Sequence, residues 1–197
     1  DMPTFDDYAK QGQDFLFGSF NNAMKYNEGV YEVWSEILRR APDARLLLKD
    51  RRFTDVHLCS RVREHFTGAG IAAERIELMS SVPTREDHFD LYRRLDVALD
   101  PFPTGGAATS IEALAMGTPV ISWVYQSMRA ACYFTASTAE RLGETNKMIA
   151  FNRDDYIRLA VAFYENQVRI DRNNLACQTR KRLEAKNYAE QFVGHIR

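Results

Sequence analysis

The stretch from Asp100 to Val120, DPFPTGGAATSIEALAMGTPV, decides the fold. It follows a short apolar run at 97–99 and begins as a loop rich in proline and glycine. Apolar residues then recur at i, i+3 and i+4 from Ile111, and Gly117 and Pro119 close this helical pattern. The order of these signals predicts a strand, a loop, a helix and a second strand.

The glycine pair in this stretch predicts a phosphate site. Gly105 and Gly106 let the backbone approach a ligand with no Cβ in the way, and Thr109 or Ser110 is expected to cap the helix that follows. Such a helix start presents unpaired N–H groups and a positive dipole end. Glu112, expected in the first turn, offers a carboxylate to a sugar hydroxyl. The ligand would carry a phosphate and a ribose, although a tight turn that binds nothing explains the loop alone equally well.

The composition indicates one globular domain with no preference for nucleic acid. The chain has 197 residues, 45% of them hydrophobic, which is enough for a full core. Its formal charge is 26 − 27 = −1, so no basic surface favours a nucleic-acid partner. No apolar run is long enough to span a bilayer and no signal peptide precedes the domain, so we expect no membrane partner and a cytoplasmic location. The abrupt start at Asp1 suggests a piece of a longer protein.

The cysteines favour neither a disulfide framework nor a metal site. Cys59, Cys132 and Cys177 are odd in number and widely spaced, with no CxxC and no zinc-like histidine spacing. We therefore interpret them as reduced, intracellular packing residues and expect no bound metal.

Strand and helix patterns alternate along most of the chain. The predicted strands are 15–20, 45–49, 75–80, 97–99, 119–124 and 148–151, and the predicted helices are about 30–38, 58–68, 86–94, 129–142 and 152–164. Repeated βα units of this kind require a parallel sheet covered on both faces. The expected fold class is therefore α/β, a doubly wound, Rossmann-like parallel sheet with a C-terminal helical tail.

The domain boundaries follow from the same pattern. We interpret 1–14 as a linker from a missing N-terminal lobe, 15–165 as the nucleotide-binding domain and 166–197 as a helical extension. In the extension, which reads as helical from Gln167, the basic residues Arg169, Arg172 and 180–182 are expected on a solvated face. The sequence GAGIAA at 68–73 matches a dinucleotide fingerprint but follows a helix and leads into a strand, which is the reverse of the required context. Gly68 is instead interpreted as a helix C-cap.

Ligands of such sheets bind at the carboxyl ends of the strands, where the strand order reverses. The loops that follow residues 20, 80, 99 and 123 should all emerge at this edge. They carry Asn21, Asn22 and Lys25, then Arg85 and His88, then 105–112, and finally 125–129. Cations, amides and a carboxylate would therefore meet around the predicted phosphate site.

Five segments together resemble a known family. They are FGSFNNAMK at 17–25, RLLLK at 45–49, SSVPTREDH at 80–88, LDVALDPFPTGGAATSIEALAMGTPVI at 95–121 and LGETNKMIAFNRDDY at 142–156. In this order, from about Phe17 to Tyr164, they are similar to the O-linked N-acetylglucosamine transferase family, glycosyltransferase family forty-one. The resemblance implies the C-terminal, donor-binding lobe of a two-lobed GT-B enzyme. The implied partners are an N-terminal lobe and tetratricopeptide repeats of the same parent chain.

The resemblance also implies roles for single residues. Lys25 matches a catalytic lysine on the donor diphosphate, and Asn22 an amide beside the same phosphates. His88 matches a histidine near the base, and Glu112 the acid that holds the ribose. Their ordinary alternatives are an exposed lysine, a turn asparagine, a histidine at a helix start and an acid that favours the helix dipole. The implied donor-binding set is completed by Arg85, Gly105, Gly106, Ala107, Ala108 and Thr109.

Several positions depart from the family pattern. Ala107 and Ala108 stand where the family carries polar side chains before Thr109. Pro83 lacks the N–H that the family directs at the base. Cys132 and Tyr133 replace a Ser-Arg pair. These departures predict fewer contacts to the donor and put the identity of the base in question.

The implied reaction is an inverting transfer of N-acetylglucosamine or a hexose from a UDP-sugar to protein Ser or Thr, or Asn. No cofactor or metal is expected, because Lys25 and the helix start at Thr109 would stabilise the departing UDP. Without its N-terminal lobe the chain is expected to be inactive. Two alternatives stay open: a non-catalytic binding or scaffold module, and another GT-B enzyme that acts on a small molecule.

Overall fold

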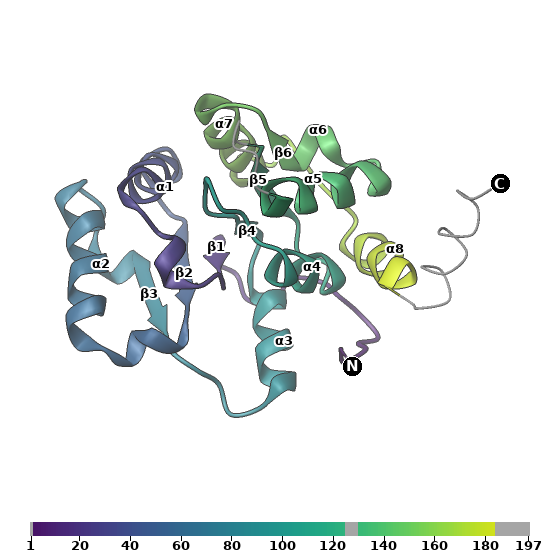
Figure 1. The fold of residues 1–197 in the computed structure, drawn as a ribbon, viewed down its shortest axis with the longest axis horizontal. Coiled ribbons are helices and arrows are strands. Elements are labelled where there is room, and N and C mark those ends of the chain that lie inside the picture. Colours follow the sequence, from purple (N-terminus) through teal and green to yellow (C-terminus); the bar gives the residue numbers. More distant parts are fainter. Residues whose placement is uncertain (1, 125–129, 184–197) are drawn as a thin grey trace.

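A six-stranded parallel sheet forms the centre of the computed structural model, which describes residues 2–124 and 130–183 (Figure 1). Its strands are β1 (Leu16–Ser19), β2 (Arg45–Lys49), β3 (Ile76–Met79), β4 (Val97–Leu99), β5 (Val120–Trp123) and β6 (Ile149–Ala150). The spatial order is β3-β2-β1-β4-β5-β6, and every pair is parallel. The strand order reverses between β1 and β4, so the doubly wound prediction is confirmed.

Helices cover both faces of this sheet (Figure 1). They are α1 (Glu28–Arg40), α2 (Val56–Gly68), α3 (Arg85–Arg94), α4 (Ala108–Ala115), α5 (Ala130–Leu142), α6 (Thr145–Met148), α7 (Arg153–Tyr164) and α8 (Arg172–Leu183). Three short 3-10 helices span Ala23–Lys25, Arg51–Thr54 and Ala73–Arg75. One apolar core joins α1, α2 and α7 to the sheet, and the other joins α3, α4 and α8.

The amphipathic pattern of α1 is confirmed and explains how the first core closes. Val30, Trp34 and Ile37 are fully buried on its inner face. The indole Nε1 of Trp34 donates a hydrogen bond to the hydroxyl of Tyr156, 3.2 Å away on α7. This bond gives the buried polar ends of both rings a partner and holds α1 against α7.

The predicted end of α2 near Gly68 is confirmed, but the C-cap prediction was wrong by one residue. Gly68 lies inside the helix, and Ala69 is the C-cap. Gly70, with φ of +81°, takes the left-handed conformation that ends the helix. The GAGIAA segment does lead from a helix into a strand, so the dinucleotide reading stays excluded.

The basic residues of α8 are not all on a solvated face, which corrects that expectation. The guanidinium of Arg172 donates to the carbonyls of Tyr8 and Leu95 at 3.0 and 2.8 Å and to Thr118 Oγ1 at 3.0 Å. Burial lowers the pKa of Arg172 to about 10. Arg180 likewise donates to the carbonyl of Ala115 on α4. Sequence periodicity could not show this, because the acceptors are backbone carbonyls from distant segments.

The first residues of the chain pack against this part of the domain. Tyr8 is buried, and its N–H donates to Asn173 Oδ1 at 2.8 Å on α8. Phe5 lies under the guanidinium of Arg93, 4.4 Å from ring centroid to Cζ. The segment 2–14 therefore contributes to the core beside α3 and α8, and the helix of the extension begins at Arg172 rather than near Gln167.

The cysteine interpretation holds in part. Cys59 is half-buried and its thiol donates to the carbonyl of Phe53, but Cys177 is exposed and is not a packing residue. The side chain of Cys132 lies outside the described residues. Within 2–124 and 130–183, no helix has the length and apolarity needed to cross a membrane.

Replacing Arg172 by Met is expected to lower the free energy of unfolding by about 2–3 kcal/mol, because it leaves buried carbonyls without a donor. Urea unfolding followed by circular dichroism measures this. The matched control is Arg169→Met at an exposed position, which should change stability by less than about 0.5 kcal/mol. Equal effects for the two variants would contradict the anchoring role of Arg172.

Candidate functional site

The strand-order reversal places two loops side by side at the carboxyl edge of the sheet. The loop after β1 contains Asn21 and Asn22 and runs into the 3-10 helix that ends at Lys25. The loop after β4 runs from Asp100 through the glycine pair into α4. The residues predicted in these two loops therefore lie close together at this edge.

Lys25 reaches across from the first loop to the second. Its Nζ donates to Asn21 Oδ1 at 3.0 Å and to the carbonyl of Gly105 at 2.9 Å. Asn21 Oδ1 also accepts from Thr109 Oγ1 at 3.1 Å, and the Asn21 side chain is buried. Lys25 is half-buried. The reading as an ordinary exposed lysine is therefore excluded, and the ammonium lies beside the glycine loop.

A buried carboxylate holds the second loop in place. Asp100 is 2% exposed and accepts hydrogen bonds from Ser110 Oγ at 2.9 Å, from Thr135 Oγ1 at 2.9 Å and from the N–H of Gly106. Burial raises the pKa of Asp100, while these donors oppose the rise. Asn21 Nδ2 approaches the same carboxylate at 3.5 Å. Asp100 therefore connects the glycine loop, α4 and α5.

The expected helix caps were wrong. The N-cap of α4 is Ala107, which has no side-chain acceptor, while Thr109 and Ser110 lie inside the first turn. Their hydroxyls turn instead to Asn21 and Asp100, because these buried groups are within reach. The N-cap residue of α4 therefore makes no side-chain hydrogen bond to the first N–H groups of this helix, which are the groups that an anion can bind. Gly105 and Gly106 are buried, whereas Ala107 and Ala108 are exposed.

Glu112 lies in the second turn of α4, not the first, so the reading as an acid that favours the helix dipole does not apply. Its Oε2 lies 3.2 Å from His88 Nε2 and accepts a hydrogen bond from the Tyr92 hydroxyl at 3.1 Å. Burial and the Glu112 carboxylate raise the pKa of Tyr92 well above its ordinary value, so Tyr92 remains a donor. Both partners of Glu112 come from α3.

His88 is not a helix-start histidine satisfied by backbone, because its ring nitrogens face side chains. Nδ1 lies 3.1 Å from the Nζ of Lys49, and Nε2 faces Glu112. The rings of Phe20 and Tyr92 lie 6.1 and 5.4 Å away, centroid to centroid. His88 and Glu112 stay partly exposed, at 23% and 21% of their side chains. They can therefore contact a ligand.

The side chains of Asn22 and Arg85 lie at the outside of this edge. Asn22 is exposed, and its Oδ1 caps the 3-10 helix at the N–H of Met24 and accepts from Arg52 at 2.8 Å. The turn reading of Asn22 therefore describes what the structure shows. Arg85 is exposed at the start of α3, with its guanidinium over the ring of Phe89 at 5.5 Å. No contact in the described structure brings Arg85 to Lys25 or Glu112.

Sequence reasoning missed four polar residues of this edge. Lys49 is the last residue of β2 and Asp50 follows it, Tyr92 lies on α3, and Arg52 donates to both Asp50 and Asn22. Asp50 Oδ2 also accepts from the N–H of Ala23, so the loops after β1 and β2 are joined. The signal that could have found Lys49 and Asp50 is their place at the carboxyl end of a buried strand of the same sheet.

Part of the predicted site lies outside the residues that the structure describes. Residues 125–129 and the side chain of Cys132 lie outside the described part of the chain, and Tyr133 is exposed. Among the described residues, no group of three or more His, Cys, Asp or Glu could hold a metal ion. Pro83 is exposed just before α3.

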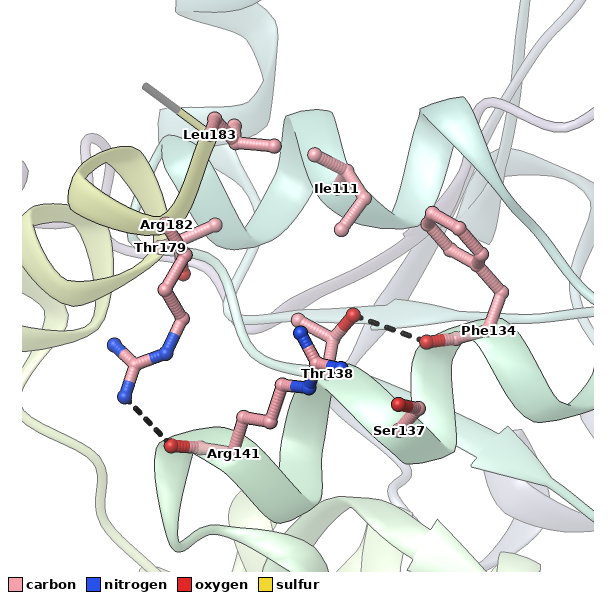
Figure 2. Close-up of a pocket in the computed structure, with 8 residues that line it drawn as sticks. All are labelled: Ile111, Phe134, Ser137, Thr138, Arg141, Thr179, Arg182 and Leu183. Carbon is pink, nitrogen blue, oxygen red and sulfur yellow. Dashed lines mark hydrogen bonds between the residues drawn. The ribbon is translucent and has the colours of Figure 1, made fainter. Parts of the chain in front are cut away.

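A separate small cavity of about 130 Å³ lies between α4, α5 and α8 (Figure 2). Ile111, Phe134 and Leu183 form its apolar side, and Arg182 donates to the carbonyl of Arg141 at 2.7 Å across its other side. None of the ten predicted site residues lines it, so it is not the predicted site.

A family model and the sequence relatives agree on one family. The model for "Glycosyl transferase family 41" matches residues 2–192. Two probable UDP-N-acetylglucosamine–peptide N-acetylglucosaminyltransferases SPINDLY, from Eustoma exaltatum subsp. russellianum and Arabidopsis thaliana, are 34% and 32% identical over 149 residues. These alignments cover 74% of this chain and 16% of each relative. The similarity therefore extends over about a sixth of the length of each relative.

The structure is also similar to that of a Thermobaculum terrenum O-GlcNAc transferase mutant, with a TM-score of 0.81 and 29% identity. The match covers 98% of this chain and 38% of that protein. The fold seen here is therefore the fold of one part of a larger glycosyltransferase.

Gly106→Ala is expected to lower stability by about 1–3 kcal/mol, because the added Cβ overpacks a buried site. A Cβ there would lie 2.0 Å from Ser110 Oγ and 2.6 Å from Asp100 Oδ1. Thermal unfolding measures the loss. Gly68→Ala, where a Cβ meets nothing within 4 Å inside α2, should be neutral or slightly stabilising. A Gly106→Ala variant as stable as the unmodified chain would contradict the role given to Asp100.

Proposed function

We propose that this chain, which belongs to glycosyltransferase family 41, is the lobe that binds the nucleotide diphosphate sugar in a protein glycosyltransferase. One observation carries the proposal. The Lys25 ammonium and the uncapped start of α4 lie at the same glycine loop, while Glu112 lies one turn further along that helix. Positive charge for a diphosphate therefore lies at the start of α4, and a carboxylate for a ribose lies one turn further along the same helix.

The diphosphate would bind at the start of α4. The N–H groups of the first turn and the positive end of the helix dipole attract an anion, and the buried glycine pair presents no Cβ to it. Lys25 Nζ would add a mobile charge, moving from Asn21 Oδ1 and the Gly105 carbonyl to a phosphate oxygen. We assign this position to the phosphates for these reasons.

The ribose would bind at Glu112. His88 and Tyr92 both contact Oε2, and within the described structure no donor contacts Oε1. A carboxylate oxygen of this kind accepts hydrogen bonds from vicinal hydroxyls. The partly exposed His88 ring lies beyond it, where the base would follow. The proposed donor is a uridine diphosphate sugar, in keeping with the donor named for the SPINDLY relatives.

The proposed reaction is an inverting displacement at the anomeric carbon. The acceptor oxygen forms a bond to this carbon while the bond to the UDP oxygen breaks, and the acceptor proton leaves to a base or to water. Negative charge then grows on the diphosphate, where Lys25 and the α4 N-terminus stabilise it. The proposed sugar is N-acetylglucosamine or a hexose, and the proposed acceptor is protein Ser or Thr, with Asn as an alternative.

The acceptor and the proton acceptor would come from elsewhere in the parent protein. The chain spans only 38% of the O-GlcNAc transferase structure that it resembles, and its described residues supply the side of the leaving group. We therefore propose a facing N-terminal lobe, preceded by tetratricopeptide repeats, in an intracellular protein. The catalytic role of Lys25 belongs to this assembled enzyme.

One observation favours a second candidate, a nucleotide-binding module without catalysis. Ala107 and Ala108 are exposed at the phosphate position and offer no side-chain hydroxyl. Such a module would still bind a nucleotide through backbone N–H groups. A glycosylation assay of the full-length parent protein with a radiolabelled UDP-sugar separates the two, since only the enzyme transfers label to protein.

Isothermal titration of this chain with UDP tests the proposed binding site. Lys25→Ala and Glu112→Ala are each expected to weaken UDP about tenfold or more, because each removes a hydrogen bond involving a charged group. Glu112→Ala should affect UDP more than its 2′-deoxy analogue, since the proposed contact is with the ribose. GDP should bind more weakly than UDP.

The matched control is Lys147→Ala on α6, where the ammonium of Lys147 pairs with the carboxylate of Glu144. It should leave UDP affinity unchanged. Circular dichroism spectra should show every variant folded. A folded chain that binds UDP equally well with and without Lys25 and Glu112 would refute the placement of the site.

A further inference from the structure

A line of polar contacts runs from β2 through α3 to α4. Lys49 Nζ lies 3.1 Å from His88 Nδ1, and His88 Nε2 lies 3.2 Å from Glu112 Oε2. Three elements that are distant in sequence thus meet through one imidazole ring. Lys49 is half-buried, with its Nζ 5.8 Å from the centroid of the Phe20 ring.

The two partners of His88 require the same arrangement of its proton. An ammonium has three donors and no acceptor, so Nδ1 must accept from Lys49. A carboxylate only accepts, so Nε2 must carry the proton and donate to Glu112. Both conditions are met by a neutral imidazole protonated at Nε2. The opposite tautomer would place a proton against the ammonium and a lone pair against the carboxylate.

This arrangement also fixes the carboxylate. With the Nε2 proton of His88 and the hydroxyl of Tyr92 both on Oε2, the plane of the Glu112 carboxylate is held and Oε1 is turned to the other side. A carboxylate already oriented loses less conformational entropy when it binds a sugar. If Lys49 were absent, His88 could exchange tautomers or rotate, and Glu112 would lose one of its two donors.

We infer that Lys49 is a positioning residue that holds His88 in the Nε2-protonated form and thereby orients Glu112 for its ligand. Its consequence for ribose binding rests on the proposed function, whereas the tautomer of His88 does not. Lys49 acts here through His88 and makes no contact of its own with the nucleotide.

Nitrogen-15 NMR of the histidine side chains tests the first part without any ligand. The chain has four histidines, and His88→Gln identifies the resonances of His88 by their loss. At neutral pH the unmodified chain should show His88 with a protonated Nε2 and an unprotonated Nδ1. A protonated Nδ1, or equal populations of both tautomers, in the unmodified chain would overturn the inference.

Lys49→Met should shift His88 to a mixture of tautomers, because the side chain keeps its length and loses its donor. Lys49→Arg, which keeps a cationic N–H donor, should retain the Nε2 form. Lys147→Met on α6 is the matched control and should leave the His88 signals unchanged. Unchanged His88 signals in a folded Lys49→Met variant would contradict the positioning role. If Lys49→Met does not fold, the tautomer of His88 in the unmodified chain and in Lys49→Arg tests the inference instead.

A titration with UDP tests the second part. Lys49→Met should weaken UDP about tenfold, and the double variant Lys49→Met/Glu112→Ala should bind no more than about twofold worse than Glu112→Ala alone, because coupled residues are not additive. Additive losses would show that Lys49 contacts the nucleotide directly and would overturn the inference. If the unmodified chain binds no UDP, the proposed function fails while the tautomer result still stands.

Discussion

The carboxylate of Asp100 lies buried at the end of β4 and is surrounded by donors that come from three directions. Ser110 holds it from α4, Thr135 from α5, and the N–H of Gly106 from the loop between. An unpaired charge in this position would cost several kcal/mol, so the loop must keep its conformation for the carboxylate to stay solvated by protein groups. Gly106 fits because any Cβ would meet Asp100 and Ser110.

The two parts of the proposed ligand site depend on this anchor in different ways. Asn21 lies between Asp100 and Lys25, so the loop after β1 is fastened to the same carboxylate that fastens the loop after β4. Further along α4, Glu112 takes its donors from α3. The start of α4 therefore takes its position from the sheet, and its second turn is supported by the neighbouring helix. The diphosphate would bind at the start of α4, and the ribose would bind at its second turn.

Much of the fold could be predicted from sequence because its signals are local. Strand β2 matches the predicted range, and α2 ends at Gly68, where its end was predicted. The glycine loop, Lys25 and Glu112 could be found because they follow strands of a doubly wound sheet. The caps of α4 could not, since the pull of a buried Asp100 and Asn21 on two hydroxyls is a tertiary effect that outweighs capping propensity.

The same limit explains the other differences. Arg172 looks like one charge among many in a polar helix, yet its acceptors are carbonyls of segments far away in sequence. Lys49 ends a strand that was predicted correctly, but its partner His88 belongs to α3 and its pairing needs the sheet to be assembled. Sequence patterns identified most of the loops that meet at the edge. They could not show how those side chains pair.

We propose that the carboxyl edge between β1 and β4 binds a nucleotide diphosphate. An amide NMR titration of this chain with UDP tests it most directly, because it locates the ligand residue by residue. We expect the largest shifts on 105–112, on Lys25 and on His88, with little change along α8. Shifts centred on the cavity between α4, α5 and α8, or no shifts at all from a folded chain, would contradict it.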